Sequence, residues 1–409
     1  MPLEKPALPL PKNPLADFGL VYAANAVVAF LFASSAPVAI VLSMGSRGGL
    51  TPSDLASWIF AGFFINGLIT IVLALLYRQP LCFFWTIPGT VLVGPALTHV
   101  SFPEAIGAFI ATGVLMLLLG LSGWVRRAMQ AVPMPIVMAM VAGVFLRFGL
   151  DLIYALRDGF WIAAPMVVIF VALSFFPRLA RVLPPLIAAL IVGAIAIWWL
   201  GHFNPPAGAL FAIAEPNFYV PQFSWPAMVE LVVPLAITVL VVQNGQGIAI
   251  LTANGHEPPV NAITITCGLG SIVTAFFGAV STCLTGPVNA ILSSSGEKER
   301  HYTAAVFIGL IAMAFGLIAP SLTRLMLATP PAYIAALAGL AILRVLQTAF
   351  QASFSERFSF GALICFLVTV ADVPIFHIGA PFWGLVFGLV ASWLLERDDH
   401  RTEKTSPTE

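Results

Sequence analysis

Phe83-Phe-Trp-Thr-Ile-Pro-Gly-Thr90 is the most informative segment of this 409-residue chain, and Ser281-Thr-Cys-Leu-Thr-Gly-Pro-Val-Asn289 is its counterpart in the second half. In both, a short run that favours extended backbone precedes Gly and Pro, and a run of apolar or small residues follows. The proline in each suits the first turn of a helix, because a backbone N–H is not needed there. The runs at 89–100 and 286–295 are shorter than the about 20 residues that cross a bilayer. We therefore predict two half-helices that end inside a membrane.

The composition is that of a membrane protein. Hydrophobic residues make up 60% of the chain and charged residues 9%, whereas soluble proteins carry about 25% charged residues. The 18 basic and 18 acidic residues cancel, which argues against a nucleic-acid partner, because neutralising phosphates needs a basic surplus. The four cysteines are isolated, and no zinc-protease, nucleophile-elbow or phosphate-loop motif is present. We predict a polytopic protein surrounded by lipid that is not an enzyme and has no catalytic residue, metal site or cofactor.

Apolar runs long enough to span a bilayer recur along the whole chain. Twelve are expected to cross fully, at residues 18–43, 55–77, 104–124, 133–150, 160–176, 183–200, 226–254, 260–280, 302–322, 331–350, 358–373 and 380–395. With the half-helices as segments 3 and 10, the prediction is an all-α polytopic membrane protein of fourteen segments. Polar tails at 1–17 and 396–409 are expected to be disordered, and the connection 201–225 separates a first seven-segment repeat, 18–200, from a second, 226–395.

The two halves share a weak internal repeat. Gly89 and Pro133 in the first half match Gly286 and Pro330 in the second at one offset of 197 residues. Because seven segments per half is an odd number, the second half enters from the opposite side, which predicts an inverted repeat of the kind found in many secondary transporters. With the N-terminus inside, fourteen Lys and Arg residues fall on the cytoplasmic side and four on the outer side. This satisfies the positive-inside rule and predicts that both termini are cytoplasmic.

The starts of the two half-helices are the predicted binding site. Short Gly/Pro-interrupted segments at matching positions of two repeats indicate a transporter site, and helix N-termini present free N–H groups and a positive dipole end. No Lys or Arg occurs within 79–125 or 182–297, so an anion at the midplane would be met by helix ends and hydroxyl groups. The alternative is that both segments are only kinked packing elements. The predicted substrate-binding residues at these starts are Thr86, Ile87, Pro88, Gly89, Thr90, Thr282, Thr285, Gly286, Pro287 and Asn289.

Three amides add to this site from segment 8, which contains Val242-Gln-Asn-Gly-Gln-Gly247. Gln243 and Gln246 share a helix face, and we interpret them, with Asn244, as ligands of substrate or water. Hydrogen bonds between helices are the alternative role. Asn25 on segment 1 is a further candidate, and Phe84 is placed to stack on a flat ring, although core or lipid packing is the commoner role of such a side chain.

Five motifs together resemble the benzoate membrane transporter family over residues 18–395. They are Trp85-Thr-Ile-Pro-Gly89, Glu104-Ala-Ile-Gly-Ala-Phe109, Ala142-Gly-Val-Phe-Leu-Arg-Phe-Gly149, Gln243-Asn-Gly-Gln-Gly247 and Phe382-Trp-Gly384. The resemblance implies uptake of benzoate with a proton, and a distant similarity in fold to the uracil and sulfate transporter superfamily. It implies a core domain of segments 1–4 and 8–11, which holds both half-helices, and a gate domain of segments 5–7 and 12–14.

One departure concerns the carboxylates of the uracil-type relatives. Glutamates stand there at positions that correspond to Gln243/Asn244 and Thr285/Gly286 in this chain. Amides in their place suit an anionic substrate, because they remove a repulsion, but they also leave the proton without an assigned carrier.

The sequence therefore predicts a secondary transporter of a bacterial inner membrane that imports benzoate or a related aromatic carboxylate by proton symport and alternating access. The anion would bind between the two half-helix N-termini. A homodimer is left open. The alternatives are the same fold with a nucleobase, an inorganic anion or another carboxylate as substrate, and an anion channel.

Overall fold

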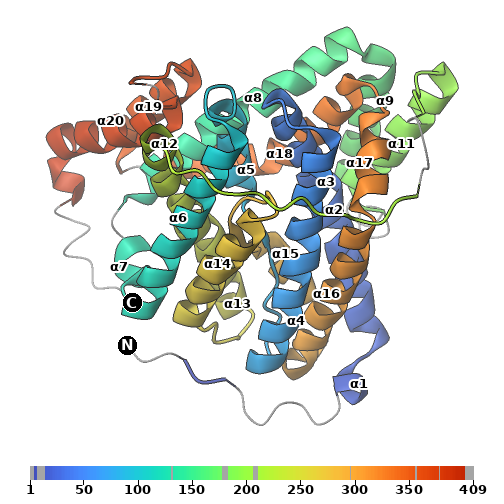
Figure 1. Ribbon diagram of the computed structural model, residues 1–409, viewed down its shortest axis with the longest axis horizontal. Helices are drawn as coiled ribbons and strands as arrows, with labels where there is room; N and C mark the ends of the chain where they lie inside the picture. Colours follow the sequence, from blue (N-terminus) through green and yellow to red (C-terminus); the bar gives the residue numbers. More distant parts are fainter. Residues whose placement is uncertain are drawn as a thin grey trace.

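The computed structural model describes residues 4–6, 14–129, 132–176, 183–205, 211–294, 296–354, 357–376 and 378–400, which are folded mostly into helices (Figure 1). Within these ranges, seven helical segments are long and apolar enough to span a membrane: Leu20–Arg47, Pro52–Tyr77, Phe102–Ser122, Met134–Asp158, Trp225–Ala253, Lys298–Leu317 and Pro331–Ser353. Six shorter apolar helices accompany them: Ile87–Ala96, Phe160–Phe175, Pro185–Leu200, Val260–Ala275, Ser359–Ala371 and Ala380–Leu395.

Among the described residues, the elements leave 211–224 as the longest stretch without helix or strand. In chain order they are α1 (Pro14–Asp17), α2 (Leu20–Arg47), α3 (Pro52–Phe60), η1 (Ala61–Ile65), α4 (Asn66–Tyr77), β1 (Phe83–Trp85), α5 (Ile87–Ala96), α6 (Phe102–Ser122), α7 (Val125–Met129), α8 (Met134–Asp158), α9 (Phe160–Phe175), α11 (Pro185–Leu200), α12 (Trp225–Ile237), η2 (Thr238–Asn244), α13 (Gly245–Ala253), α14 (Val260–Ala275), β2 (Thr282–Leu284), α15 (Gly286–Leu292), η3 (Lys298–Arg300), α16 (His301–Leu317), α17 (Ala319–Leu327), α18 (Pro331–Ser353), α19 (Ser359–Ala371) and α20 (Ala380–Leu395). The π-helical segments η1 and η2 continue the helices on either side of them.

Several predicted boundaries were wrong. Helix α8 continues eight residues beyond the predicted end at 150, and Asp151, the first residue after that end, forms an ion pair with Arg47. The predicted segment 302–322 is two helices, since Pro320 near the start of α17 cannot donate the backbone hydrogen bond that would continue α16. Helix α15 ends at Leu292, short of the predicted end at 295, a position outside the described residues.

The prediction of a wholly disordered N-terminal tail was also wrong, although most of both predicted tails lies outside the described residues. Residues 14–17 form α1. The carboxylate of Glu4 accepts hydrogen bonds from the backbone N–H groups of Asn261 (3.1 Å) and Ala262 (3.3 Å) at the start of α14. A helix N-terminus attracts a negative charge, so this contact gives the tail a defined place.

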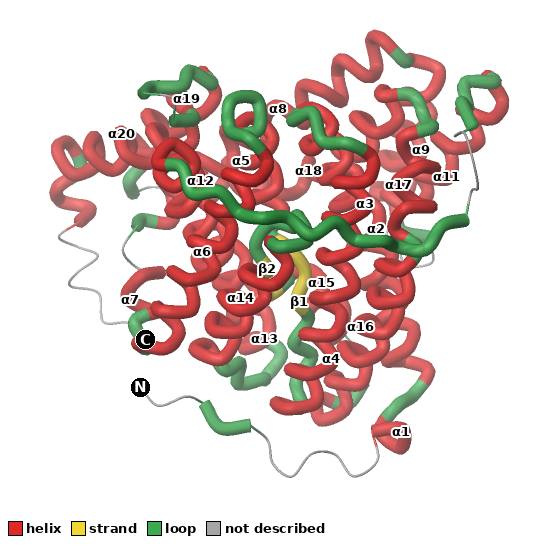
Figure 2. The backbone as a smooth tube through the Cα atoms, in the orientation of Figure 1, coloured by secondary structure: helices red, strands yellow, loops and turns green. Residues whose placement is uncertain are grey.

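A two-stranded antiparallel sheet lies among the helices, near the middle of Figure 2. Phe83 pairs with Leu284, and Trp85 pairs with Thr282. Two further backbone hydrogen bonds extend the pairing, from Thr86 to Ser281 and from Thr285 to Cys82, both at 3.0 Å. The strands belong to segments about 200 residues apart, and each leads directly into a short helix. The pairing therefore places the starts of α5 and α15 side by side.

Glycines allow the helices to approach closely. The Cβ of any other residue at Gly268 on α14 would lie 2.8 Å from the carbonyl oxygen of Gly113 on α6. Gly309 on α16 has the same relation to Gly67 on α4, with a distance of 2.8 Å. Inside lipid, helices gain no hydrophobic free energy from packing against each other. Small residues stabilise the contact because they allow close van der Waals packing of the two backbones. These contacts hold α4, α6, α14 and α16 around the paired strands.

A second set of helices packs mainly within itself. Helix α8 packs against α18 and α19, α19 packs against α20, and α9 packs against α11. Gly388 on α20 fits against the carbonyl oxygen of Gly361 on α19, so the GxxxG pattern Gly384–Gly388 serves helix packing. Fewer pairs join the two sets, among them α2 with α18, α5 with α8 and α12 with α20.

Residues 211–224, in the connection between the halves, form an extended strap, visible as the loop that crosses the front of Figure 2. Its backbone N–H groups donate to carbonyl oxygens of three helical regions, from Ala214 to Leu317 (2.8 Å), from Tyr219 to Phe276 (2.8 Å) and from Gln222 to Pro103 (2.9 Å). Burial and the hydrogen bond from its hydroxyl to Asp54 raise the pKa of Tyr219 above its ordinary value. The strap therefore ties α6, α14 and α16 together.

A pair of buried histidines in the loop after α13 and at the start of α16 predicts a pH-dependent stability. Nε2 of His256 lies 3.1 Å from Nδ1 of His301. Burial, then the charges of His301 and Lys298, lower the pKa of His256 from 6.5 to about 4. Between these values the unfolded chain binds a proton that the folded chain does not, so stability is lost as the pH falls from about 6.5 towards 4.

Thermal unfolding of the detergent-solubilised protein between pH 7.5 and 5 tests this expectation. The melting temperature of the wild type should fall with pH, and His256→Gln should flatten that dependence. The exposed His202 provides the control, since His202→Gln should leave the slope unchanged. An equal slope in wild type and His256→Gln would contradict the assignment.

Candidate functional site

The first half of the site is the start of α5, which follows β1 directly. Thr86 is the N-cap residue, and its Oγ1 accepts a hydrogen bond from the backbone N–H of Gly89 at 3.1 Å. The same hydroxyl group lies 3.2 Å from Oγ1 of Thr238 on η2. Oγ1 of Thr90 donates to the carbonyl oxygen of Thr86 at 2.9 Å. The threonines predicted as ligands here are therefore used by the protein itself, and the N-terminus of α5 is already capped.

The start of α15 has a different arrangement. Thr285 occupies the N-cap position but its side chain does not cap the helix, because Oγ1 accepts a hydrogen bond from the backbone N–H of Phe84 at 3.1 Å. Pro287 has no N–H to donate, which leaves the amide groups of Gly286 and Val288 in the first turn without a cap from Thr285. First-turn N–H groups have no acceptor within their own helix. The N–H group of Val288 is therefore uncapped, whereas the N–H group of Gly89 at the corresponding position of α5 is capped by Thr86.

Two other predicted ligands hold the strands in place. Oδ1 of Asn289 accepts a hydrogen bond from the backbone N–H of Cys82 at 2.9 Å. Its Nδ2 is buried and has no hydrogen-bond partner among the described residues. Oγ1 of Thr282 donates to Oδ1 of Asn66 at 2.8 Å. The side-chain oxygen of Asn289 thus holds the chain before β1, while its buried NH₂ group is free to donate a hydrogen bond to a ligand.

The three predicted amides lie at the junction of η2 and α13 and differ in their surroundings. Oδ1 of Asn244 accepts a hydrogen bond from the backbone N–H of Leu284 at 2.8 Å, so this amide holds β2. Gln243 is buried, whereas Gln246 is exposed. A Cβ at Gly286 would lie 2.9 Å from both Cγ and Oε1 of Gln246. Gln246 therefore lies directly over the start of α15, where the absence of a side chain at Gly286 leaves room for it.

The remaining candidates lie on α2 and β1. Asn25 is half-buried on α2, a helix that packs against both α5 and α15. Phe84 is 3% exposed, and its ring packs edge-to-face against Phe63 with centroids 5.4 Å apart. Ile87 is half-buried, and Pro88 and Gly89 are buried. Phe84 therefore has a packing role in this conformation, which was the alternative to ring stacking.

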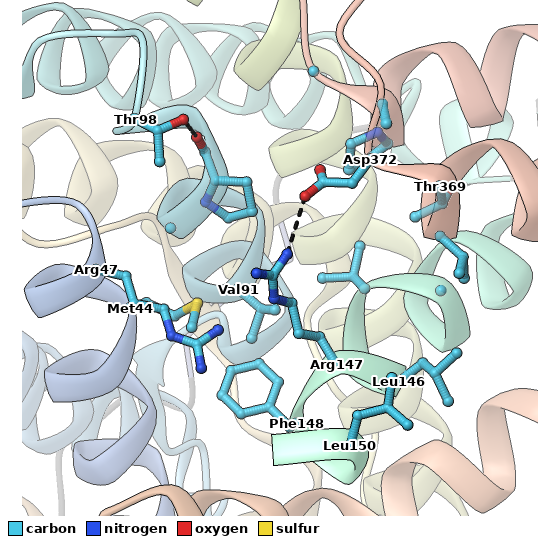
Figure 3. Close-up of a pocket in the computed structure, with 18 of the residues that line it drawn as sticks. Met44, Arg47, Val91, Thr98, Leu146, Arg147, Phe148, Leu150, Thr369 and Asp372 are labelled. Atoms are coloured by element: carbon cyan, nitrogen blue, oxygen red, sulfur yellow. Dashed lines mark hydrogen bonds and ion pairs between the residues drawn. The ribbon is translucent and has the colours of Figure 1, made fainter. Parts of the chain in front are cut away.

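A cavity of about 660 Å³ opens beside α5, and its wall was not predicted (Figure 3). It is bounded by residues of α2, α5, α8 and α19, and by the chain before α20. Val91 and Gly94 in its wall lie one turn along α5 from the site at Thr86–Thr90. The cavity therefore leads towards the start of α5 from the side where α2 and α8 carry their charged residues.

Charged side chains around this cavity form pairs. Arg47 on α2 forms an ion pair with Asp151 on α8. Arg147 on α8 lies 3.1 Å from Asp372, and Figure 3 shows both side chains at the cavity. Arg47 and Arg147 are two of the four basic residues that the charge distribution predicts on the outer side. The available signal was the position of Arg147 and Asp151 well inside α8, since a charge within an apolar helix needs a partner or water.

Comparisons with known proteins agree with this geometry. The family model described as "Benzoate membrane transport protein" matches residues 17–394. Two relatives cover most of the chain. Inner membrane protein YdcO of Escherichia coli (strain K12) is 32% identical over 87% of this chain and 90% of its own. The Benzoate membrane transport protein of Acinetobacter baylyi (strain ATCC 33305 / BD413 / ADP1) is 28% identical over 93% of this chain and 96% of its own.

Two solved structures share the fold. The transmembrane domain of the cyanobacterium bicarbonate transporter BicA superposes with a TM-score of 0.62 at 15% identity, over 90% of this chain and 97% of that domain. The murine anion transporter Slc26a9 in its inward-facing state gives 0.62 at 15% identity, over 91% of this chain and 68% of its own. At this identity the likeness concerns the fold alone. The protein has the fold of membrane transporters, and by sequence it belongs to the benzoate membrane transport protein family.

Proposed function

We propose that this transporter imports benzoate or a related aromatic carboxylate by proton symport, and that the carboxylate binds at the start of α15. The observation that carries the proposal is the uncapped first turn of α15, which offers the N–H groups of Gly286 and Val288 to an acceptor, with Gln246 above them. An anion is favoured at such a helix start by the backbone dipoles and by the N–H groups together.

The charges around this position support an anion rather than a cation. The first turns of α5 and α15 contain no acidic residue, and segment 8 carries amides where a carboxylate would repel the substrate. The buried Nδ2 of Asn289 adds a donor on the same short helix. The other proposed ligands are Thr86, Ile87, Pro88, Gly89, Thr90, Gln243, Asn244, Thr282, Thr285, Pro287, Asn25 and Phe84. In this account their main task is to shape and fix the two helix starts.

The proposed architecture is a fourteen-segment inverted repeat of seven plus seven, with α5 and α15 as the half-helices of segments 3 and 10. Support comes from their lengths of ten and seven residues and from the antiparallel pairing of the strands that precede them. The core domain would comprise segments 1–4 and 8–11, and the gate domain segments 5–7 and 12–14. Helices α8, α9, α11, α18, α19 and α20, which pack mainly on one another, correspond to the gate.

Transport would follow from movement of the core against the gate. The cavity bounded by α2, α5, α8 and α19 lies at the boundary between these two groups, so it is the proposed entrance on one side of the membrane. The charge distribution along the sequence places that side outside and both termini in the cytoplasm, in a bacterial inner membrane. A homodimer is compatible with this arrangement, as the exposed apolar faces of the gate helices offer room for a second copy.

Uptake of labelled benzoate into proteoliposomes tests the substrate. Because neutral benzoic acid crosses bilayers unaided, the signal is the initial rate above that of protein-free liposomes. We expect saturable uptake that an alkaline interior accelerates and that unlabelled benzoate suppresses. Bicarbonate, sulfate and uracil should not compete. If one of these compounds suppresses the uptake and unlabelled benzoate does not, that compound would replace benzoate as the proposed substrate. If the initial rate rises with benzoate concentration without saturating, the protein would be a channel.

A further inference from the structure

A buried acidic side chain faces the cavity through a histidine. Glu230 lies on α12 and is 6% exposed. Its Oε2 is 2.8 Å from Nε2 of His99, which follows α5 and lines the cavity with a side chain that is 29% exposed. A carboxylate held in an apolar segment is costly without a partner, so the contact with His99 needs a function or a strong structural reason.

The same carboxylate also contacts the gate side of the cavity. Glu230 accepts a hydrogen bond from the backbone N–H of Gly379, the residue before α20. Gly379 carries no side chain, and a Cβ there would overlap Oε1 of Glu230. The carboxylate of Glu230 thus joins α12 and His99, which belong to the proposed core, to the chain at the start of α20, which belongs to the proposed gate.

No basic side chain compensates the charge of Glu230 among the described residues. The charged group that faces it from the loop after α19 is Asp372, which is acidic and pairs with Arg147 at 3.1 Å. Glu104 at the start of α6 is engaged by Ser101, and helices α5, α20 and η2 contain no charged residue. His377, in the loop before Gly379, lies outside the described residues. The charge of Glu230 is therefore balanced only when a proton is bound by the pair.

We propose that His99 and Glu230 together bind the transported proton, an inference that rests on the proposed symport of benzoate. With one proton the pair is neutral overall, as an imidazolium beside a carboxylate, and without it the pair carries one negative charge. A benzoate anion entering from the cavity therefore favours proton binding by the pair, and proton binding favours benzoate to the same extent.

Through the contact with Gly379, proton binding affects how easily the core moves relative to the gate. The N–H group of Gly379 is attracted by the net charge of the pair, which is one negative charge without the proton and zero with it. An unprotonated pair therefore holds Gly379 most strongly and resists separation of α12 from the chain before α20. Loading the proton weakens this contact, which permits the core to move when proton and anion are both bound.

Two variants test the pair in the full-length protein in proteoliposomes. Glu230→Gln removes the titratable carboxylate and keeps a carbonyl acceptor for Gly379, and His99→Gln removes the imidazole from a partly exposed position. The matched control is Glu104→Gln, because glutamine also serves the capping box at the start of α6. Two rates are measured. The first is exchange of labelled for unlabelled benzoate at equal pH, and the second is initial uptake with an interior about one pH unit more alkaline. For one proton per benzoate, this gradient can support about a tenfold accumulation of benzoate.

In the wild type and in Glu104→Gln, we expect exchange and acceleration by the gradient, both above the background of protein-free liposomes. In Glu230→Gln, which keeps a neutral acceptor for Gly379, exchange should persist, while the gradient should change the initial rate by less than about twofold. In His99→Gln the carboxylate of Glu230 loses its partner and holds Gly379, so both exchange and acceleration by the gradient should decrease. Full acceleration in both variants would overturn the inference and leave the proposed function intact. If both variants lose benzoate exchange as well as acceleration by the gradient, the pair has a structural role and the inference is overturned. Absence of wild-type exchange would instead refute the proposed function.

Discussion

Gly286→Leu is expected to abolish benzoate uptake while the protein remains folded. A leucine side chain would project from the start of α15 into the space below Gln246, where Cβ alone would lie 2.9 Å from Cγ and Oε1. It would exclude a carboxylate from the N–H groups of Gly286 and Val288. Two charge-assisted hydrogen bonds of about 1.5–3 kcal/mol each would be lost, which corresponds to a decrease in affinity of about a hundredfold or more.

The fold should tolerate this change. Gly286 does not have a positive φ, so leucine introduces no backbone strain, and the atoms that it meets belong to the end of an exposed, flexible side chain. Gly245→Ala is the matched control, since its Cβ would make only ordinary contacts, with Cε of Met129 at 3.4 Å and with the carbonyl oxygen of Leu240 at 3.7 Å. Gel filtration and thermal unfolding should be unchanged in both variants, and uptake should be lost only in Gly286→Leu. Wild-type uptake by Gly286→Leu would show that the anion binds elsewhere.

Gln246→Glu is expected to weaken benzoate binding strongly through charge alone. The glutamate side chain has nearly the same shape as glutamine, and its carboxylate would lie over the start of α15, where the substrate carboxylate is proposed to bind. Two like charges about 4 Å apart near a protein surface repel by about 4 kcal/mol, and the exposure of residue 246 reduces this to about 1.5–3 kcal/mol. Benzoate affinity should therefore fall by about ten- to a hundredfold.

The neutral variant Gln246→Met separates charge from the loss of the amide. It keeps the length of the side chain, so its effect should be smaller than that of Gln246→Glu. Measuring benzoate binding by calorimetry in low and high salt gives a second criterion, because added salt should narrow the difference between these variants. Equal affinities of Gln246→Glu and Gln246→Met at low salt would contradict an anion at the start of α15.

Much of the fold could be predicted because hydropathy and proline position are local properties. Every predicted full-length segment contains a helix, and the extended residues before Gly89 and Gly286 are β1 and β2. Helix ends were less predictable where a tertiary contact compensates an unfavourable residue. Asp151 ends an apolar run in sequence, yet α8 continues through it because Arg47, about 100 residues away, pairs with it.

The roles of individual polar side chains could not be predicted, since they depend on partners far away in the chain. Thr86 and Thr285 occupy equivalent positions before the two short helices. Only Thr86 caps its helix, because the hydroxyl oxygen of Thr285 accepts a hydrogen bond from the backbone N–H of Phe84 on the paired strand. Asn244 was predicted as a ligand together with Gln243 and Gln246, but its Oδ1 holds β2. This asymmetry, which singles out α15, became visible only with the strand pairing.

The charged pairs at the cavity were missed for the same reason. In sequence, His99 and Glu230 lie near the ends of unrelated segments 131 residues apart. No local pattern indicates that the chain after α5 and the first turns of α12 meet. The resemblance to uracil-type transporters implied only that their glutamates are replaced at Gln243/Asn244 and Thr285/Gly286, and it gave no position for another carboxylate.

The most direct test of the account is the distance between benzoate and the start of α15. Solid-state NMR measures it in proteoliposomes, by dipolar coupling between benzoate labelled with ¹³C in its carboxylate and protein labelled with ¹⁵N in glycine. Comparison with Gly286→Ala assigns the coupled nitrogen. We expect a carbon-to-nitrogen distance of about 4 Å or less to Gly286, as a hydrogen bond requires. Bound benzoate without measurable coupling to that nitrogen would contradict the central claim.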